Sequence, residues 1–595
     1  MSNLNRLTPV LSRLPEFRLS RRAVVKIAIL AGIVSPRARA SAAGRAGASL
    51  APARAQTTGE EQIFYHAGLQ QDPATFDVNL HPESGAEVET FAGLLTFDAN
   101  LNAVGDWAVS WDVNEDASLY TFYIRQYNKG WSDGTPVTAH DFVWSWQRQL
   151  NPDNGVQHAE RLYDIKYARH IHTRAKVDDE QDPLNGQVPS VEQLGVVALD
   201  DWTLQVTLAG PRAYFPQVLA CRETVPAPRW QVEKYGDKWA LGGDVPIVSN
   251  GPLKVDQWEH DTAIHMSRNK GYWSANWMKL AKVIDPILPA DRAIAAYEKG
   301  ADGTRLDWTE LTPEAFSQFS ADPTLAKQIQ PSLEPGIWML VPQVTIAPFD
   351  QLEVRQALSH AIDRRRLVTV TTGQTMAASC MVPPNMYGYL DEPELRDIQN
   401  FDPQKALALL KGTPYDGGKE WPDLALVYPA GDEASPAGVL AKEIAAQLTE
   451  HLHLNVTLQS VTEPDFSEQL LKNAWPLVLS PWMYDYPDPN NGYGDLFYSR
   501  REGGRRQAWS NPDFDDLIEQ AWAEPDQRKR LDLYLAAERL LQTDAGYLPL
   551  VYPLRQLVFK PWVRGVPVNR AGLLAPDNRF MQRMLTQVYV EGRQE

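Results

Sequence analysis

The order of apolar segments between residues 423 and 480 constrains the fold more than any other feature of this 595-residue chain. The stretch follows the order strand, helix, strand, helix and strand, and these segments cover residues 423–428, 435–448, 454–458, 464–471 and 476–480. Strands that alternate with helices in this way form a mainly parallel sheet with helices on its faces. The sequence therefore predicts an α/β fold, and ligands of such sheets bind beyond the carboxyl ends of the strands.

A second group of elements lies earlier in the chain. Residues 117–125 alternate like a strand and are apolar on both faces, so we expect a strand that is covered on both sides. A helix is expected to begin at Thr138, with Phe142, Val143 and Trp146 on one face. The polar, irregular residues 178–189 are typical of a surface loop.

The length and the charge of the chain bound its class. Hydrophobic residues make up 44% and charged residues 22%, which is a globular balance, and the length favours two or three domains. Residues 1–55 hold ten Lys or Arg and only one acid, which leaves 47 basic and 74 acidic residues and a net charge of −27 in the remainder. This acidic body argues against nucleic acid or an anionic membrane surface as a partner and favours cationic or amine-bearing ligands.

The N-terminus is typical of an export signal. The pair Arg21-Arg22 precedes the apolar run 27–34 and the Ala-x-Ala sites that end at Ala40 and Ala55. This order predicts that residues 1–55 are a signal peptide, and the paired arginines favour the twin-arginine route. The apolar run is too short to span a membrane. No cysteine follows either site, so we expect a free periplasmic protein and not a lipoprotein.

Cysteine usage and missing motifs limit the chemistry. The chain has only Cys221 and Cys380, far apart in sequence, and we expect two buried thiols. The sequence lacks the nucleophile-elbow, zinc-protease, Cys-x-x-Cys and dinucleotide-binding motifs. We therefore expect no catalysis, no cofactor and no metal. A secreted hydrolase with a carboxylate pair stays open, because a chain with 75 acids offers many such pairs.

The stretch PWMYDYPDPNN, residues 481–491, starts where the third strand of the alternating pattern is expected to end. Its first acid, Asp485, stands among three aromatic residues and a methionine. A carboxylate buried there without a partner is costly or takes up a proton, so a positive group should meet it. We expect the ligand to supply that group. The alternative is a turn in which Asp485 caps a helix or pairs with an arginine of the protein.

Several stretches together resemble a known family. They are WSDGTPVTAHDFVWSWQR at 131–148, SNGPLKVDQW at 249–258, NKGYW at 269–273, FDQLEVRQALSHAIDRR at 349–365, and PWMYDYPDPNN itself. In length and order they resemble the peptide/nickel-binding family 5 of extracellular solute-binding proteins, which feed ATP-driven (ABC) importers. The resemblance covers nearly all of the chain after residue 60, and the oligopeptide-binding branch looks nearest.

The resemblance implies a two-lobed periplasmic binding protein, type II and cluster C-like, with a small extra domain inserted in the first lobe. Lobe I would comprise residues 56–91, 222–332 and 553–595, the inserted domain 92–221, and lobe II 333–552. A helix over 354–366, with Val354, Leu358 and Ile362 inward, would pack against the sheet of lobe II.

The resemblance also implies a function and a site. A monomer would bind oligopeptides between its lobes and deliver them to the permease and ATPase subunits of an importer. In peptide-binding members the acid matched by Asp485 holds the ligand's α-ammonium, and Trp482 and Tyr486 of the same motif are further candidate contacts. Residues 79–81 resemble the segment that pairs with the extended peptide as an added strand, which gives Leu80 and His81 as candidate contacts.

The chain departs from the family pattern at two places. No basic residue precedes Trp482, where some relatives carry one for a ligand carboxylate, and Glu334 and Met483 stand where some relatives carry a cysteine pair. Three alternatives stay open. The ligand could be a nickel complex, an opine or an oligosaccharide, the receptor could serve signalling, or the protein could be the secreted hydrolase mentioned above.

Overall fold

The structure is a computed structural model that describes residues 62–66, 69–81, 87–300, 304–384, 386–390, 392–429, 435–500, 506–569, 572–574 and 583–593. The predicted signal peptide, residues 1–55, lies outside the described residues. Within the described part, every helix is too short or too polar to traverse a lipid bilayer.

One four-stranded sheet has the order β1-β10-β9-β8, in which β1 runs parallel to β10 and the other pairs are antiparallel. Its strands are β1 (Ile63–Tyr65), β8 (Leu253–Glu259), β9 (Ala263–Arg268) and β10 (Lys282–Pro286). Near it along the chain lie α3 (Glu87–Thr90), α7 (Arg229–Tyr235), α8 (Ala290–Lys299) and α9 (Pro313–Ala321). The pair β2 (Leu95–Phe97) and β3 (Ala103–Gly105) and the pair β19 (Val563–Arg564) and β20 (Tyr589–Val590) form short ribbons.

A second four-stranded sheet is wholly antiparallel, with the order β4-β5-β7-β6. It consists of β4 (Ala108–Val113), β5 (Leu119–Ile124), β6 (Val196–Asp200) and β7 (Thr203–Thr207). The predicted strand is thus confirmed as β5, but the expectation that both its faces are covered is wrong. Tyr120, Phe122 and Ile124 are buried, whereas Tyr123 on the other face is exposed, because only one face of this sheet packs against the core.

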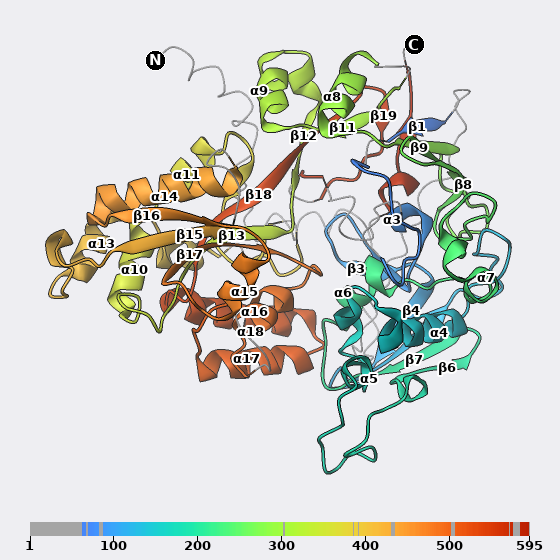
Figure 1. Cartoon of the computed structure of the whole chain (residues 1–595), viewed down its shortest axis with the longest axis horizontal. Helices are drawn as coiled ribbons and strands as arrows, with labels where there is room; N and C mark the ends of the chain where they lie inside the picture. Colours follow the sequence, from blue (N-terminus) through green and yellow to red (C-terminus); the bar gives the residue numbers. More distant parts are fainter. Residues whose placement is uncertain are drawn as a thin grey trace, which may run out of the picture. The chain divides into compact units, whose positions relative to one another are not determined.

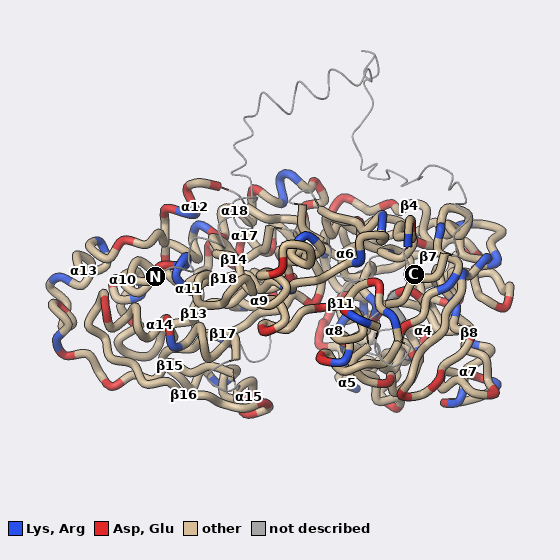
Figure 2. Tube along the Cα trace, turned by 90° about the horizontal axis from the view of Figure 1, so that it is seen from above, with Lys and Arg blue, Asp and Glu red and all other residues tan. Residues whose placement is uncertain are grey.

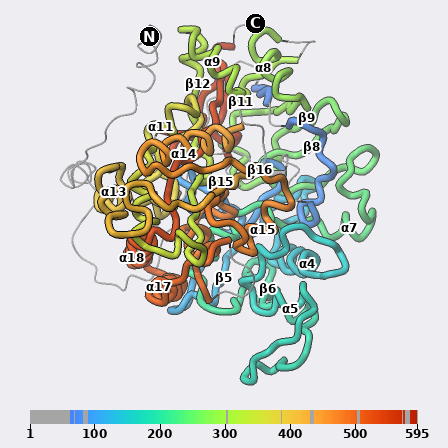
Figure 3. The backbone as a smooth tube through the Cα atoms, turned by 60° about the vertical axis from the view of Figure 1, so that its left-hand side comes forward, coloured from blue at the N-terminus to red at the C-terminus, as the bar shows by residue number. Residues whose placement is uncertain are grey.

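The helix expected from Thr138 is confirmed as α4 (Ala139–Leu150). Thr138 and Asp141 form a capping box, in which the Asp141 carboxylate accepts a hydrogen bond from the Thr138 backbone N–H at 2.7 Å. Phe142 and Trp146 are buried on the predicted face. The chain continues through α5 (Ala168–Thr173) into the polar loop predicted at 178–189, which projects beside α5 in Figures 1 and 3.

The largest sheet has eight strands. Its path is β11-β18-β13-β17-β15-β16, and β12 and β14 also pair with β18. The strands are β11 (Trp308–Glu310), β12 (Ile329–Leu333), β13 (Gly336–Pro342), β14 (Thr375–Ala377), β15 (Leu424–Pro429), β16 (Val456–Val461), β17 (Leu477–Met483) and β18 (Leu548–Phe559). Figure 1 shows β18 in red, running from β13 to β12 and β11.

The predicted alternation of strands and helices over 423–480 is confirmed as β15, α14 (Pro436–Leu452), β16, α15 (Asp465–Leu471) and β17. β15 is parallel to both β16 and β17. The expectation of a mainly parallel sheet is nevertheless wrong for the sheet as a whole. Strands from outside this segment, β13 and β18, join it antiparallel, since their chain direction is set by connections elsewhere.

Helices cover both faces of this large sheet. Apolar side chains of α10 (Leu352–Ala361), α11 (Arg364–Val370), α13 (Pro403–Leu410) and α14 pack on one face. On the other face lie α15, α16 (Pro489–Phe497), α17 (Pro512–Ala523) and α18 (Gln527–Thr543), with α12 (Pro393–Ile398) against α18. This double cover explains why the strands are apolar on both sides.

The helix predicted over 354–366 is interrupted. Val354, Leu358 and Ile362 are fully buried as expected, but α10 ends at Ala361 and Ile362 is extended. Asp363 then caps a new helix, α11, by accepting a hydrogen bond from the Arg365 N–H at 3.0 Å. A local cap therefore ends the first helix where the apolar period alone predicts continuation.

Charged positions are interspersed along the described chain, as Figure 2 shows, with acidic residues on helices, strands and loops alike. Asp141 is buried in the capping box of α4, and burial raises its pKa to about 6.

Prediction on pH dependence. The pKa of Asp141 is higher in the folded protein than its ordinary value of 3.8, so the folded state binds more protons between pH 4 and 6 and this residue's contribution to stability falls as the pH rises through that window. The native chain should lose up to about 3 kcal/mol of unfolding free energy in this way, and Asp141→Asn should not show this loss. Urea unfolding at pH 4 and pH 7 should show the variant improving relative to the native chain at pH 7. Parallel pH profiles for the two proteins would contradict the assignment.

Candidate functional site

A cavity of about 1050 Å³ is lined by residues of the large sheet, among them parts of β11 and β18, and by residues from earlier in the chain, among them 69–71 and 286–293. Residues that line it come from parts of the chain that are far apart in sequence, namely from within 69–71, 286–293, 308–316, 334–338, 374–375 and 553–556, together with Arg222 and Pro436. The volume is at the upper end of what ligand pockets of proteins usually hold. β18 forms one side of it through residues 553–556.

The cavity wall carries both signs of charge. The Arg555 guanidinium lies between two carboxylates, donating from Nε to Glu310 at 2.9 Å and approaching Glu334 at 3.9 Å. Arg222 lines the cavity at another point and lies 3.6 Å from the Glu223 carboxylate. Such a wall suits a ligand that has polar ends of both charges together with apolar surface.

The motif at 481–491 begins inside β17 and not after it. The predicted strand 476–480 is confirmed, but pairing with β13 continues as far as Met483, which lies opposite Gly336. The Tyr484 N–H then donates to the Pro335 carbonyl at 2.8 Å. Glu334, the residue before Pro335, lines the cavity, whereas no residue of the motif itself, Trp482, Asp485 and Tyr486 included, is part of the cavity wall.

Asp485 already has a protein partner. Its Oδ1 lies 2.7 Å from the Arg161 guanidinium, so the expectation that this carboxylate is kept without one is wrong. Arg161 belongs to a short 3-10 turn, Ala159–Leu162, that follows α4. The pairing is nevertheless incomplete, since 37% of the Asp485 side chain is exposed and no described residue donates to its second oxygen, Oδ2. A carboxylate has room for more than one such partner.

Acidic neighbours stabilise the protonated, charged form of Arg161. Burial acts to lower the pKa of this guanidinium, but Asp485 and Glu223 outweigh it and raise the pKa above its ordinary value. The Arg161 side chain is only 13% exposed, and its Nε is buried without a hydrogen-bond acceptor among the described residues. Arg161 thus keeps one unused donor beside the Asp485 carboxylate.

Trp482 lies partly buried in β17, next to another arginine. The Arg506 guanidinium lies 5.1 Å from the centre of the Trp482 ring. Burial lowers the pKa of Arg506, and Asp485 is the carboxylate that opposes this effect most. The Trp482 Nε1 is a second buried donor without an acceptor among the described residues. A ligand contact at Trp482 stays a prediction, and the site around it offers donors and positive charge.

Tyr486 is placed as a core residue. Its side chain is buried and stacks on Tyr214 with ring centres 5.6 Å apart. The hydroxyl donates to Asp495 at 3.0 Å and accepts from the Asn490 amide at 2.7 Å. The hydrogen-bonding capacity of Tyr486 is therefore used inside the protein, and its predicted ligand contact finds no support in this geometry.

Leu80 and His81 lie in a turn and do not line the cavity. Their N–H groups donate to the Asp77 carbonyl at 3.1 and 2.8 Å, and the Leu80 carbonyl accepts from the Gln157 N–H at 3.3 Å. The backbone groups of Leu80 are therefore not available to an added strand. Nothing in the structure tests a contact through the exposed His81 side chain, so both residues remain predicted contacts.

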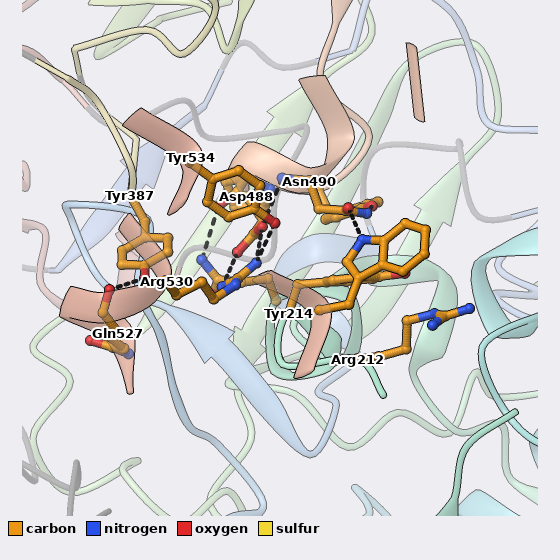
Figure 4. A network of polar contacts seen from close by, with 12 residues as sticks. Arg212, Tyr214, Tyr387, Asp488, Asn490, Gln527, Arg530 and Tyr534 are labelled. Carbon is orange, nitrogen blue, oxygen red and sulfur yellow. Dashed lines mark hydrogen bonds and ion pairs between the residues drawn. The ribbon is translucent and has the colours of Figure 1, made fainter. Parts of the chain in front are cut away.

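A buried ion pair fixes the second half of the motif. Asp488 caps α16, accepting from the Asn490 N–H at 2.9 Å, and pairs with both terminal nitrogens of Arg530 in α18, one of them at 2.9 Å. Figure 4 shows the two groups facing each other, with Tyr534 and Tyr387 close to the guanidinium. This pair ties the turn that carries Asp485 to the helical layer behind the sheet.

The motif also contacts the chain around α6 (Phe215–Leu219). The Gln217 amide donates to the Pro487 carbonyl at 2.9 Å, and the Cys221 thiol lies 3.7 Å from the Asp485 carbonyl oxygen. Cys221 and Cys380 are both free and buried, which confirms the two buried thiols. Among the described residues no group of His, Cys, Asp and Glu is arranged to hold a metal ion.

Sequence reasoning missed the arginines of this site. Arg161 lies 324 residues before Asp485 in the chain and Arg506 lies 21 residues after it, and neither stands in a motif. Glu334 was noted in the sequence only because it stands where some relatives carry a cysteine. In the structure it lines the cavity. The spacing of charges along the sequence gave no other indication.

The geometry described above agrees with comparisons to known proteins. The model of the bacterial extracellular solute-binding proteins, family 5, matches residues 102–504. The chain belongs to this family. Its relatives include the periplasmic oligopeptide-binding protein OppA of Salmonella typhimurium, which is 30% identical over 91% of this chain and 95% of its own length. Another family 5 relative is the probable deoxycholate-binding periplasmic protein YgiS of Escherichia coli, 28% identical over 86% of this chain and 91% of its own.

The fold of this family 5 member is also found among solved structures. The periplasmic murein tripeptide binding protein MppA, in its unliganded open form, superposes with a TM-score of 0.76 over 90% of this chain and 98% of its own, at 24% identity. The likeness confirms the predicted α/β fold of a two-lobed periplasmic binding protein. The domain boundaries given above stay predictions.

Prediction on the buried ion pair. Asp488→Asn keeps the size of the side chain and its cap on α16 but leaves Arg530 buried and unpaired, which should cost about 3–5 kcal/mol of unfolding free energy. Arg539→Gln is the matched control on α18, because its pair with Glu394 is exposed and should contribute less than about 1 kcal/mol. Urea unfolding of both variants measures the difference. Equal, small losses would show that the Asp488–Arg530 pair does not hold the motif.

Proposed function

We propose that this chain is the periplasmic substrate-binding protein of an ABC importer and binds short peptides by their free amino terminus. The single observation that carries the peptide chemistry is the Asp485 carboxylate, which has one oxygen paired with Arg161 and the other available. It directly follows Tyr484, whose N–H bonds Pro335 next to Glu334 in the cavity wall. The ligand's α-ammonium would take Oδ2 while Arg161 keeps Oδ1. A charge-assisted bond of this kind typically contributes about 1.5–3 kcal/mol.

The cavity supports the same proposal. A volume of about 1050 Å³ accommodates a chain of several residues with bridging water. Its wall mixes Trp308, Trp338 and Phe316 with the charged Arg555 and its two carboxylate partners. A wall built in this way tolerates different side chains, since few of its groups demand one particular ligand atom. Trp482 and His81 would add contacts at the amino-terminal end, with Leu80 and Tyr486 behind them.

Family membership supports the partners and the location. Relatives are named as periplasmic oligopeptide-binding proteins, and an extracellular solute-binding protein has to pass its ligand to a membrane permease driven by an ATPase. We propose that the chain acts as a monomer, is exported by the twin-arginine route and carries no lipid. The lobes would be residues 56–91, 222–332 and 553–595 for the first and 333–552 for the second, with 92–221 inserted, and closure over the ligand would be a hinge motion.

A different ligand class is the second candidate. A relative named as probably deoxycholate-binding shows that proteins of this similarity include one whose name specifies no peptide. A steroid acid has no ammonium group for Asp485. Mass spectrometry of whatever co-purifies with the native protein decides between the two, and recovery of intact peptide after prolonged incubation would exclude the hydrolase alternative.

Prediction on the amino terminus. Asp485→Asn removes the negative charge that meets the ligand ammonium, so the Kd for tri-alanine should rise about tenfold to a hundredfold. The Kd for N-acetyl-tri-alanine, which has no ammonium group, should change less than about threefold. Isothermal titration calorimetry measures both.

Asp516→Asn is the matched control for this prediction. Asp516 is an exposed acid that pairs with Arg500 away from the motif, so its loss should leave both Kd values unchanged. If Asp485→Asn weakens the free and the acetylated peptide equally, Asp485 does not hold the α-ammonium. If neither peptide binds the native protein, the peptide function itself is wrong.

A further inference from the structure

Two arginines surround the one carboxylate that faces the proposed amino-terminal site. Arg161 pairs with Asp485 Oδ1 at 2.7 Å, and Arg506 lies over the Trp482 ring three residues earlier in the motif. The neighbouring Arg222 has its own carboxylate in Glu223 at 3.6 Å. Asp485, Arg161 and Arg506 together therefore carry a net charge of +1 before any ligand arrives.

Arg506 is a half-buried cation, and no carboxylate of the described residues contacts it. No described residue accepts a hydrogen bond from its guanidinium or forms an ion pair with it, and the guanidinium lies 5.1 Å from the centre of the Trp482 ring. Glu463 is the other carboxylate that acts on it, but Glu463 is engaged with the Ser467 hydroxyl at 2.9 Å. Leaving an arginine half-buried and unpaired is unfavourable, so the site favours the arrival of an anion.

The unused hydrogen-bond donors of the site also favour an anionic group in the ligand. The Arg161 Nε and the Trp482 Nε1 are both buried and lack an acceptor among the described residues. The Arg506 backbone is held in place, because its carbonyl accepts from the Gln343 amide at 3.3 Å, and the same amide group accepts from the Ala508 N–H at 3.2 Å. Three residues of the site, Arg161, Trp482 and Arg506, thus keep donors that no described residue uses, and Asp485 keeps one carboxylate oxygen that no described residue uses. The surplus is of donors and of positive charge.

A ligand that brings only an ammonium group makes this imbalance worse. With a bare α-ammonium bound, the site would hold a net charge of +2 in surroundings partly shielded from water, where like charges repel strongly. A ligand that also brings a carboxylate close to its amino terminus returns the total to +1 and fills the unused donors. Planar guanidinium groups match carboxylates in geometry, and a flat aromatic ring beneath one fixes its orientation.

We propose that Arg506, supported by Trp482, selects peptides that carry an acidic side chain at the first or second residue. This inference rests on the proposed binding of the amino terminus at Asp485 and adds the preferred class of peptide. Arg161 and Arg506 would hold the acidic side chain from two sides while Asp485 holds the ammonium. Arg506, 24 residues after Trp482, supplies a positive charge close to its ring, whereas the residues directly before Trp482 have none.

The test compares peptides that differ only in one charge. The probes are Asp-Ala-Ala and Ala-Asp-Ala, each against its counterpart with Asn in place of Asp, with Kd values measured by isothermal titration calorimetry. The native protein should bind at least one acidic peptide about tenfold more tightly than its Asn counterpart. In Arg506→Gln this preference should fall below about threefold, and the Asn peptides should bind at least as tightly as they bind the native protein, because a positive charge near the ligand ammonium is gone.

Controls separate this inference from the proposed function. Arg500→Gln removes an exposed arginine that pairs with Asp516 and Glu519 on α17, and it should keep the full preference. Arg506→Lys should keep part of it, since the charge remains but the planar fork is lost. Equal affinity for Asp and Asn peptides in the native protein, or a preference that survives in Arg506→Gln, overturns the inference while amine-dependent binding at Asp485 still stands. If no peptide binds at all, both fall together.

Discussion

The pairing of β18 is the interaction on which the rest of the structure depends. The first half of this strand pairs with β13 and the second half with β12 and β11, so one continuous element joins the part of the large sheet that carries the motif to the segments on the other side of the cavity. Residues 553–556, where the pairing of β18 passes from β13 to β12, form part of the cavity wall. Because the ladder fixes their position, Arg555 can hold Glu310 and approach Glu334 at the same time.

The two acids of the motif at 481–491 differ in how completely an arginine pairs with them. Asp488 and Arg530 neutralise each other inside the protein and keep the turn rigid, whereas Asp485 shares only one oxygen with Arg161 and stays accessible. Two acids of the same short motif thus have different tasks, and the difference comes from what surrounds them. A fully buried acid with a bidentate partner stabilises the fold, and a partly exposed one with a single partner remains open to a ligand.

Local features of the fold could be predicted from the sequence. Ser435 before Pro436 marks the start of α14, and the apolar spacing of Leu440, Ile444 and Leu448 gives its buried face, because caps and periodicity act within a few residues. The same holds for β15, β16 and β17. The antiparallel neighbours β13 and β18 could not be predicted in this way, since sheet pairing joins residues that are distant along the chain and leaves no mark on either strand.

In the candidate site, too, the local motif could be predicted from the sequence but the long-range contacts could not. The motif located Asp485, but the arginines around it come from a turn after α4 and from a segment after α16, and no spacing rule connects them to the motif. The break between α10 and α11 shows the reverse case, in which one local acid, Asp363, overrides an apolar period that continues through it. Long-range electrostatic pairs and competing caps are the two kinds of interaction that the pattern of apolar residues does not encode.

The two buried thiols have a consequence for where the chain can mature. Cys221 and Cys380 are the only cysteines of the protein, and neither is bonded to the other. No covalent cross-link has to form, so the fold needs no oxidant and does not distinguish a reducing compartment from an oxidising one. The native structure can therefore be completed on either side of the membrane that the protein has to cross.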